Sequence, residues 1–505
     1  MEPPDGRGHP DEYSRDRDLH LRSEVLHRWH LGGGGQVTRL NFLLIQTDDQ
    51  GRWAVPWRMP ELPMPNLERF ARDALELDRF YCASPVCSPS RASVLTGRLP
   101  SAHGVHDWLV GARHGDSWPD DYLAGQPTTP EVLARVGYQC AMSGKWHVGD
   151  SRRPAPGFEY WYAHRFGGGD YYGAPIWREG EESTEERYFT RAVTQQAVEF
   201  LQTRDHSRPF YLQVNYTAPH HPWVDSHLPE YLDKLDGVEF DSVPRLPRHP
   251  WAEVRDEFDD AFADPVPQLK GYVASLMAVD EGLGHLLGEL EAQGLLENTV
   301  VAWFSDNGFS CGHHGIWGKG NGTYPLNFFD NSVRVPCVVR MPGGATGISD
   351  ELLSAASWHA TICELAGVKA PEDGYSVSES FADVLRGRRT SPNEVVAVVS
   401  EYGDGRMVTD GQFTLVLRDG GPDELYDGAS DPGQTTNRIS DPRLASVREH
   451  LSRQLDDWFR KGERPGYSGQ RRGVSGYGQV HPVSRGVSPE RSYVGLGADS
   501  LDGTA

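Results

Sequence analysis

The chain has 505 residues, of which 38% are hydrophobic, and it carries a formal net charge of -23 at pH 7. This length and apolar content can bury one large core and a smaller one, so two domains are expected. The acidic balance argues against non-specific nucleic-acid binding, which needs clustered Lys and Arg, and weighs mildly against a long polyanionic substrate. Because no run of about twenty apolar residues occurs, we also expect no membrane span.

The N-terminal residues 1–38 are rich in Asp, Arg, His, Pro and Gly and contain no apolar run long enough for a signal-peptide core. They predict a flexible tail and a cytoplasmic protein. The six cysteines are scattered without a C-x-x-C pair, which in a cytoplasmic chain favours reduced thiols over disulfides or a zinc site. They are Cys82, Cys87, Cys140, Cys311, Cys337 and Cys363.

The first apolar run, 40–46, predicts a buried strand that leads directly into Asp48 and Asp49. Two carboxylates leaving a buried strand are costly unless something positive holds them, and a hard divalent cation such as Ca²⁺ or Mg²⁺ does so. Taken alone, an Asp-rich turn facing solvent is the commoner explanation of such a pair.

A twelve-residue stretch, 87–98, predicts a reactive side chain at the start of a helix. Pro89 fits an early helical position and Gly97 can end the segment. A helix N-terminus offers unpaired N–H groups and a positive dipole end, which stabilise an anionic nucleophile or a bound oxyanion. Arg91 follows Cys87 by one helical turn and shares its face. These residues alone leave open an activated cysteine, an anion site or a buried structural cysteine.

Helical periodicity follows over 66–75 and 128–136, and 137–142 reads as a strand. The strand leads into Lys145 and His147, which are two apart and would share one face of an extended segment. A Lys and a His after a strand are more often surface groups.

A further strand, 210–214, leads into the segment that contains His220. The polar, Pro-rich residues 225–264 predict a long irregular excursion that can border a substrate cleft. Apolar spacing over 268–293 predicts a helix that packs in the core.

A second strand-like run, 300–304, ends in Asp306 and Asn307. Because ligands collect beyond the carboxyl ends of strands in open α/β sheets, these side chains can meet Asp48 and Asp49 around one cation. The glycine-rich residues 308–319 then predict a mobile loop whose backbone can approach a ligand closely.

The remaining elements are a strand over 332–340, a helix over 357–366, short strands from about 392 onward and an amphipathic helix over 444–459. They predict four segments of the chain, which are a tail over 1–38, a large domain over 39–391 that the resemblance described next makes the catalytic domain, a smaller domain over 392–462 and a Gly/Ser/Arg-rich tail over 463–505.

The motifs in these segments, taken together, closely resemble those of the type I sulfatases of the alkaline phosphatase superfamily. The resemblance covers about 40–459 and rests on a run of signature segments. These are Cys-x-Pro-Ser-Arg with Leu-Thr-Gly-Arg, Gly-Lys-Trp-His-x-Gly, Pro-His-x-Pro, the two Asp-containing strand ends, Gly-x-His-Gly-x-x-x-Lys, Ser-x-Arg-Val-Pro and Glu-Leu-Tyr-Asp. One departure is Asn331, where the family often has an acidic residue, and another is the absence of the usual Asp near the start of the helix over 357–366.

The resemblance implies an α/β fold with a large mixed β-sheet sandwiched by helices, and a smaller C-terminal α+β domain with a short antiparallel sheet. It implies that a maturation enzyme oxidises Cys87 to Cα-formylglycine. The implied ligands of Ca²⁺, with Mg²⁺ as the alternative, are Asp48, Asp49, Asp306, Asn307 and position 87. The implied catalytic residues are Cys87, Arg91, Lys145, His147, His220 and Lys319. The residues expected to border the substrate are His103, Asp107, Trp108, His313 and His314.

The activity implied by the family is hydrolysis of a sulfate monoester to an alcohol or phenol and inorganic sulfate. The motifs do not decide among aryl sulfates, sulfated sugars and alkyl sulfates, and they carry no signal for an oligomeric state. A phosphodiesterase or phosphonate monoester hydrolase of the same superfamily is the alternative enzyme, because the same metal shell and nucleophile serve both esters. The non-enzymatic alternative is a metal-stabilised binding protein in which Cys87 is never converted.

Overall fold

The computed structural model describes residues 39–110, 121–178, 180–253, 256–388, 393–400, 405–470, 478–484 and 492–493. Its centre is a ten-stranded mixed sheet. Across the sheet the strands are β13 (Gly347–Ser349), β2 (Leu75–Leu77), β12 (Cys337–Arg340), β9 (Thr299–Ser305), β1 (Asn41–Thr47), β8 (Phe210–Asn215), β4 (Gln139–Lys145), β5 (Phe158–His164), β6 (Ala174–Arg178) and β7 (Glu181–Glu185).

The five central strands, from β9 to β5, are parallel, and antiparallel strands flank them on both sides. Strand β1 shows why the predicted strands are continuous apolar runs. Leu43 and Ile45 join the core on one face of the sheet, whereas Phe42 and Leu44 join the core on the other. A strand that is buried on both faces needs apolar residues at every position, which is typical of parallel sheets covered by helices.

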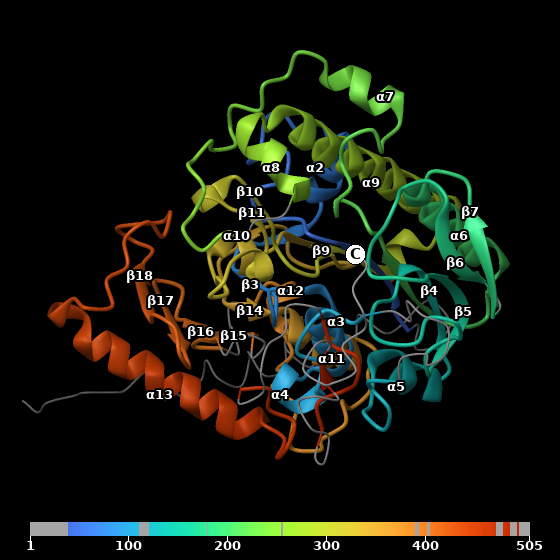
Figure 1. Cartoon of the computed structure of the whole chain (residues 1–505). Helices are drawn as coiled ribbons and strands as arrows, with labels where there is room; N and C mark the ends of the chain where they lie inside the picture. The colour runs from blue at the N-terminus through green and yellow to red at the C-terminus, as the bar shows by residue number, and fades with distance from the viewer. Residues whose placement is uncertain are drawn as a thin grey trace, which may run out of the picture.

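Helices cover both faces of this sheet (Figure 1). On one face, α2 (Pro65–Arg72) and α6 (Phe189–Thr203) pack against the long helix α9 (Val266–Ala292), whose apolar residues fill the core as its spacing predicted. On the other face lie α3 (Cys87–Thr96), α4 (Pro100–His103), α5 (Thr129–Arg135), α11 (Trp358–Leu365) and α12 (Ala382–Leu385). The large mixed sheet sandwiched by helices is therefore confirmed.

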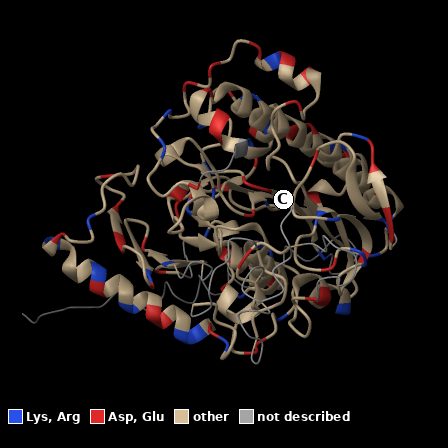
Figure 2. Cartoon of the chain, viewed as in Figure 1, with Lys and Arg blue, Asp and Glu red and all other residues tan. Residues whose placement is uncertain are grey.

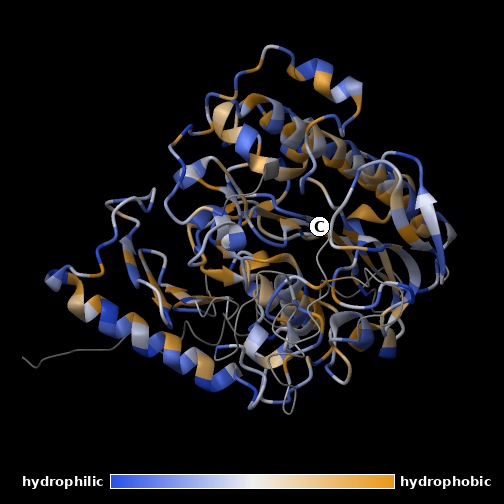
Figure 3. Cartoon of the chain, viewed as in Figure 1, coloured by the Kyte–Doolittle hydropathy of each residue, from blue (hydrophilic) through white to orange (hydrophobic). Residues whose placement is uncertain are grey.

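The smaller C-terminal unit is an antiparallel four-stranded sheet with one long helix against it. Its strands are β15 (Val396–Ser400), β16 (Gly405–Thr409), β17 (Phe413–Arg418) and β18 (Glu424–Asp427), and its helix is α13 (Ala445–Gly462). Leu451, Leu455 and Phe459 recur every four residues and are buried against the sheet. Both signs of charge line α13 (Figure 2), which is largely hydrophilic with apolar residues at intervals (Figure 3).

Three predicted elements differ from the structure. The helix expected over 66–75 ends at Arg72, and Leu75 already begins β2, because the chain must turn into an edge strand of the sheet. The strand expected over 332–340 begins only at Cys337, since residues Asp330–Val333 form the short helix α10. The glycine-rich segment 308–319 contains a two-stranded pair, β10 (Ser310–Cys311) with β11 (Trp317–Gly318).

The excursion over 225–264 is mainly irregular, as expected, and contains the short helices α7 (Pro229–Leu232) and α8 (Asp256–Ala263). Two edge strands, β3 (Phe80–Tyr81) and β14 (Leu353–Ser354), form a small parallel pair beside α3. Among the helices in the described part of the chain, none combines the length and apolar character that a bilayer crossing requires.

The described residues beyond 462 lie against the catalytic domain. Gln479 is fully buried, and its side chain makes four hydrogen bonds. Its Oε1 accepts from the backbone N–H of His106 (2.8 Å) and Asp107 (3.2 Å), and its Nε2 donates to the carbonyls of Gly104 (2.8 Å) and His481 (2.8 Å). Two backbone hydrogen bonds also join Gln479 to the segment 108–110. This C-terminal segment therefore fixes the path of residues 104–110.

Candidate active site

The site lies at the carboxyl ends of β1 and β9, which are neighbouring parallel strands. Their register places Thr47 opposite Ser305, so Asp48 and Asp306 follow immediately and lie side by side. The Asp49 backbone N–H lies 3.4 Å from Asp306 Oδ1, and Asp49 adopts a left-handed φ of 66° that turns the chain back into the site. The strand register alone therefore brings the two acidic motifs together.

Cys87 is the first residue of α3, which ends at Gly97 with a left-handed φ of 69°, as the sequence predicted. Its Sγ lies 3.3 Å from Asp48 Oδ1 and 2.7 Å from Lys319 Nζ. Burial, followed by the charge of Asp48, raises the pKa of the Cys87 thiol to about 12. A thiol with that pKa stays protonated, so this environment does not make an activated thiolate.

The carboxylates around Cys87 fit a divalent cation. Ligand atoms of Asp48, Cys87 and Asp306 all lie within 4.8 Å of one another, and all three residues are buried. Asn307 donates from Nδ2 to Asp49 Oδ1 (2.6 Å), whereas no donor among the described residues reaches its buried Oδ1. Burial and the neighbouring Asp48 charge raise the pKa of Asp306. Buried carboxylate and amide oxygens suit a hard cation.

Three basic side chains surround the same carboxylates. Lys145 forms an ion pair with Asp48, and both side chains are fully buried. Arg91 donates from Nε to Asp306 Oδ2 at 2.8 Å. Lys319 Nζ lies 2.6 Å from Asp49 Oδ1. Although burial acts to lower the pKa of Lys319, Asp49 and its other anionic neighbours raise it well above the usual value, so this lysine stays charged.

His147 lies beside these groups, but not for the predicted reason. Its φ of 52° is left-handed, so the segment is not extended and the argument that Lys145 and His147 share a strand face was wrong. His147 Nε2 lies 3.1 Å from the Leu109 carbonyl oxygen. Because a carbonyl only accepts, Nε2 carries the proton and Nδ1 keeps its lone pair. Burial, followed by Lys145 and Arg91, holds the pKa of His147 well below its usual value, so the ring is neutral.

His220 lies across the site from His147. Its Nδ1 donates to the His221 carbonyl at 2.7 Å, and its Nε2 lies 3.8 Å from Asp49 Oδ2. Burial lowers the pKa of His220 well below its usual value, and His221 and Lys145 lower it further. An anionic group bound beside this ring would offset the positive charges and raise that pKa.

A cavity of about 810 Å³ opens onto these residues. Of the predicted site residues, it is lined by Asp49, Cys87, Trp108, His147, His220 and Lys319. Much of the remaining lining was not predicted, although the run of three glycines was a visible signal for a close backbone approach. These residues include Phe166, Gly167, Gly168, Gly169, Asp170, Phe309, Trp317 and Asn321, together with Glu253 and Phe258 from the excursion that was expected to border the cleft.

Four residues expected to border the substrate do not line this cavity. His103 is fully buried, with Nε2 3.1 Å from Ser93 Oγ and Nδ1 accepting from the Val105 N–H. Asp107 is buried and caps the next backbone N–H at 2.7 Å. The remaining two pack against aromatic rings. His313 meets Trp53 at a tilt of 40° with centroids 4.7 Å apart, and His314 stacks on Phe329 at 3.8 Å. The structure therefore gives all four a packing role.

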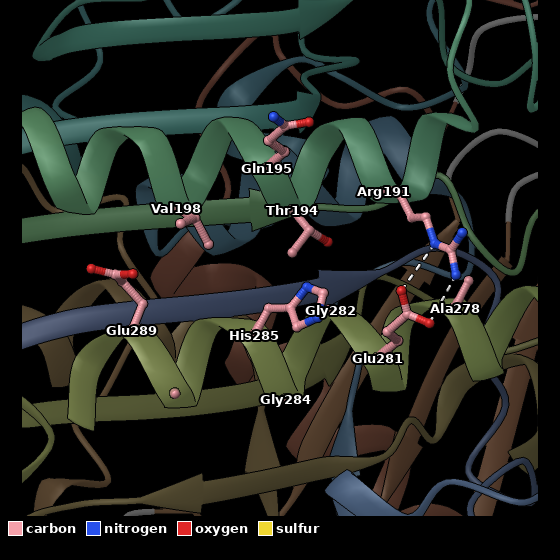
Figure 4. Close-up of a pocket in the computed structure, with 11 residues that line it drawn as sticks. Arg191, Thr194, Gln195, Val198, Ala278, Glu281, Gly282, Gly284, His285 and Glu289 are labelled. Atoms are coloured by element: carbon pink, nitrogen blue, oxygen red, sulfur yellow. Dashed lines mark hydrogen bonds and ion pairs between the residues drawn. The ribbon is translucent and has the colours of Figure 1, made fainter. Parts of the chain in front are cut away.

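A second cavity, of about 610 Å³, lies between α6 and α9 (Figure 4). An ion pair between Arg191 and Glu281 crosses one end of it, and Gly282, Gly284 and Gly288 open it along α9. Its lining includes none of the predicted catalytic or metal-binding residues. We therefore place the chemistry in the first cavity.

The fold and the site together define a hydrolase of the alkaline phosphatase superfamily, in which a central parallel sheet presents a cation site and a nucleophile position at one strand edge. The model of the Sulfatase family matches residues 40–368. The chain belongs to the sulfatase family and is a sulfuric ester hydrolase.

Named relatives agree with this assignment over most of the chain. An N-acetylglucosamine-6-O-sulfatase of Bacteroides thetaiotaomicron is 27% identical over 504 residues, which is 84% of this chain and 86% of the relative. A choline-sulfatase of Rhizobium meliloti is 28% identical over 449 residues, 80% of this chain and 83% of the relative.

Solved structures share the fold. One, bound to its substrate D-glucosamine-2-N,6-O-disulfate, has a TM-score of 0.71 at 22% identity and covers 86% of this chain and 100% of its own. A phosphonate monoester hydrolase of Agrobacterium radiobacter has a TM-score of 0.65 at 19% identity, over 84% of this chain and 96% of its own. The likeness extends to both enzymes, so the fold does not choose between a sulfate and a phosphonate ester.

Proposed function

We propose that this sulfatase acts through a Cα-formylglycine made from Cys87 and a Ca²⁺ ion held by Asp48, Asp49, Asp306 and Asn307. The observation that carries the proposal is the position of Cys87. Its Sγ lies 3.3 Å from Asp48 Oδ1 and 2.7 Å from Lys319 Nζ, within the group of buried side chains that can hold the cation. The residue that carries the conversion signal therefore stands where the nucleophile is needed.

When present, the aldehyde supplies a hydrate with one hydroxyl to attack sulfur and a second to release sulfate, and the cation supplies positive charge beside them. The chain's own residues bind and move protons. Lys319 stays charged and can hold an anionic sulfate group, with Lys145 and Arg91 adding positive charge behind the carboxylates. His147 can take a proton at Nδ1, and His220 can assist the leaving oxygen once the bound anion raises its pKa.

The lining of the cavity supports a substrate whose organic part is uncharged, and we propose a monosulfated saccharide. Aromatic side chains that can stack on a sugar ring, among them Trp108, Phe258 and Trp317, share the wall with Asp170 and Glu253, whose carboxylates can accept hydroxyl hydrogen bonds. Among the described lining residues, Lys319 is the one Lys or Arg. A second sulfate group would therefore meet no dedicated cation there. The sugar-directed relative named above supports the same class.

The test is mass analysis combined with kinetics on the matured protein. Trypsin should release the peptide from Phe80 to Arg91, in which only Cys82 should alkylate while position 87 reacts as an aldehyde. Two alkylatable thiols in active protein would refute the formylglycine, and an intact thiol without turnover would favour a binding protein. A higher kcat/KM for an aryl phosphonate than for an aryl sulfate would favour the phosphonate hydrolase alternative.

We also propose that the protein is cytoplasmic. The six cysteines are all free and buried, which suits a reducing compartment. Fractionation of the source cells with an antibody against the chain tests this location.

A further inference from the structure

Two neighbouring glycines in the loop between β5 and β6 each contact one of the two cavity histidines, Gly167 contacting His147 and Gly168 contacting His220. A Cβ atom added at Gly167 would lie 2.1 Å from Cε1 of His147, and 2.2 Å and 2.5 Å from its ring nitrogens. A Cβ atom added at Gly168 would lie 2.7 Å from Cε1 of His220 and 3.0 Å from its Nδ1. Each imidazole therefore rests directly on the backbone of one glycine.

The backbone itself does not require glycine at these two positions. The left-handed glycines of the described chain include the next residue, Gly169, with a φ of 155°, but neither Gly167 nor Gly168. An alanine could adopt the same backbone at both positions. What excludes a side chain is contact with the imidazole rings, because separations under 3.0 Å force one partner to move.

Neither ring can move away without losing its orienting hydrogen bond. His147 Nε2 is held at 3.1 Å by the Leu109 carbonyl, whose own residue donates its N–H to Ser88 Oγ at 3.1 Å. His220 Nδ1 is held at 2.7 Å by the His221 carbonyl. A glycine backbone thus fixes the plane of each imidazole ring by contact. A carbonyl that accepts from one ring nitrogen fixes the direction in which the other nitrogen points.

We propose that Gly167 and Gly168 are positioning residues that orient His147 and His220 separately, so that one loop sets both proton-transfer groups of the reaction. The inference rests on the proposed function for the roles of the histidines. Gly167 serves the step in which sulfate is released, because it holds the ring that takes the proton at Nδ1. Gly168 serves the step in which the alcohol or phenol leaves, because it holds the ring beside the leaving oxygen.

Double-mutant cycles on the matured, metal-loaded enzyme test the positioning independently of the roles. We expect Gly167→Ala to lower kcat about 10- to 100-fold. A positioned general base contributes about 100- to 10,000-fold, and the substitution displaces the base without removing it. In a His147→Ala background the ring is gone, and the same change should cost less than about twofold. Gly168→Ala should behave in the same way with His220→Ala. Equal losses in the presence and absence of the matching histidine would overturn the proposal.

Crossed pairs and an unrelated glycine supply the controls. When each half-reaction is measured on its own, Gly167→Ala should keep its full effect on the rate of sulfate release in the His220→Ala background, and Gly168→Ala should keep its full effect on the rate of phenol release in the His147→Ala background. A Cβ atom added at Gly288 on α9 would have no atom within 4 Å, so Gly288→Ala should leave kcat unchanged. If Gly167→Ala does not fold, recovery of folding by His147→Ala supports the contact, and no recovery argues against it.

The two half-reactions are read separately by rapid mixing with a series of aryl sulfates. Gly167→Ala should give a burst of about one phenol per active site, because sulfate release becomes slow. Gly168→Ala should give no burst, and its loss of kcat/KM should grow as the leaving group becomes more basic. If His147→Ala and His220→Ala themselves lack these signatures, the proposed roles fail; if they show them and the glycine variants do not, the positioning fails.

Discussion

Loss of the Gln479 side chain should loosen the segment 104–110, which contributes Trp108 and Leu109 to the wall of the active-site cavity. Gln479→Ala removes four hydrogen bonds, to the backbone of Gly104, His106, Asp107 and His481. Three of these hydrogen bonds reach the segment 104–110, so at a net of about 1 kcal/mol each the segment should lose roughly 3 kcal/mol of local stability. A loss of that size corresponds to roughly a 150-fold increase in the population of locally open states.

Hydrogen exchange read by mass spectrometry measures this directly. Peptides that cover 104–110 should exchange up to roughly 150-fold faster in Gln479→Ala, whereas peptides from β1 and β9 should keep their protection. Gln479→Met keeps most of the side-chain volume and should match Gln479→Ala within about tenfold if hydrogen bonds dominate over the cavity. Gln202→Ala, which removes one exposed hydrogen bond to Glu289, is the matched control and should change nothing in this segment. Unchanged exchange of 104–110 in both Gln479 variants would show that these hydrogen bonds do not hold the segment in place.

Three further predictions concern the chemistry and its pH range. Cys87→Ser should transfer one sulfate and then stop, so rapid mixing with an aryl sulfate should show a single turnover, and sustained turnover would contradict the proposed release step. Chelation of Ca²⁺ should abolish turnover and lower the melting temperature, and readdition at about 100 times Kd should restore about 2.7 kcal/mol, with Mg²⁺ readdition as the matched test of ion identity. Burial lowers the pKa of both His164 and His359 to about 4, so these rings are neutral in the folded protein at pH 5 but bind protons in the unfolded chain. The free energy of unfolding should therefore fall by roughly 1–2 kcal/mol per ring as the pH drops from 7 to 5, and His359→Gln should reduce that slope in calorimetry whereas the exposed His206→Ala should not.

The strands and acidic motifs of the site could be read from the sequence because their signals are local. A run buried on both faces shows continuous apolar residues, and a carboxylate pair directly after it indicates a cation site once a second strand ends in the same kind of residues. The parallel pairing of β1 with β9 then follows from the rule for strand ends. The same logic placed Cys87 at the start of α3, because proline and glycine mark both ends of that helix.

The substrate-facing residues could not be read in the same way. The direction of the segment 103–110 depends on Gln479, which lies 373 residues away from His106 and belongs to a region with little apolar content. The side chains of His103 and Asp107 are consequently buried in the protein interior, whereas Trp108 lines the cavity. His147 depends on a left-handed backbone turn, which no periodicity predicts.

The pairing of β1 with β9 also has a consequence for the order in which the molecule assembles. Asp49 and Asp306 are 257 residues apart in sequence, and Cys87 lies between them. Closing a loop of that length lowers the chain entropy before the strand contacts form to offset the loss. This pairing therefore belongs to the slow, non-local part of folding. A chain emerging from the ribosome has no cation site until Asn307 has been synthesised and β9 has docked. Cation binding would therefore report the pairing of β1 with β9 and could not serve as the nucleus of that pairing.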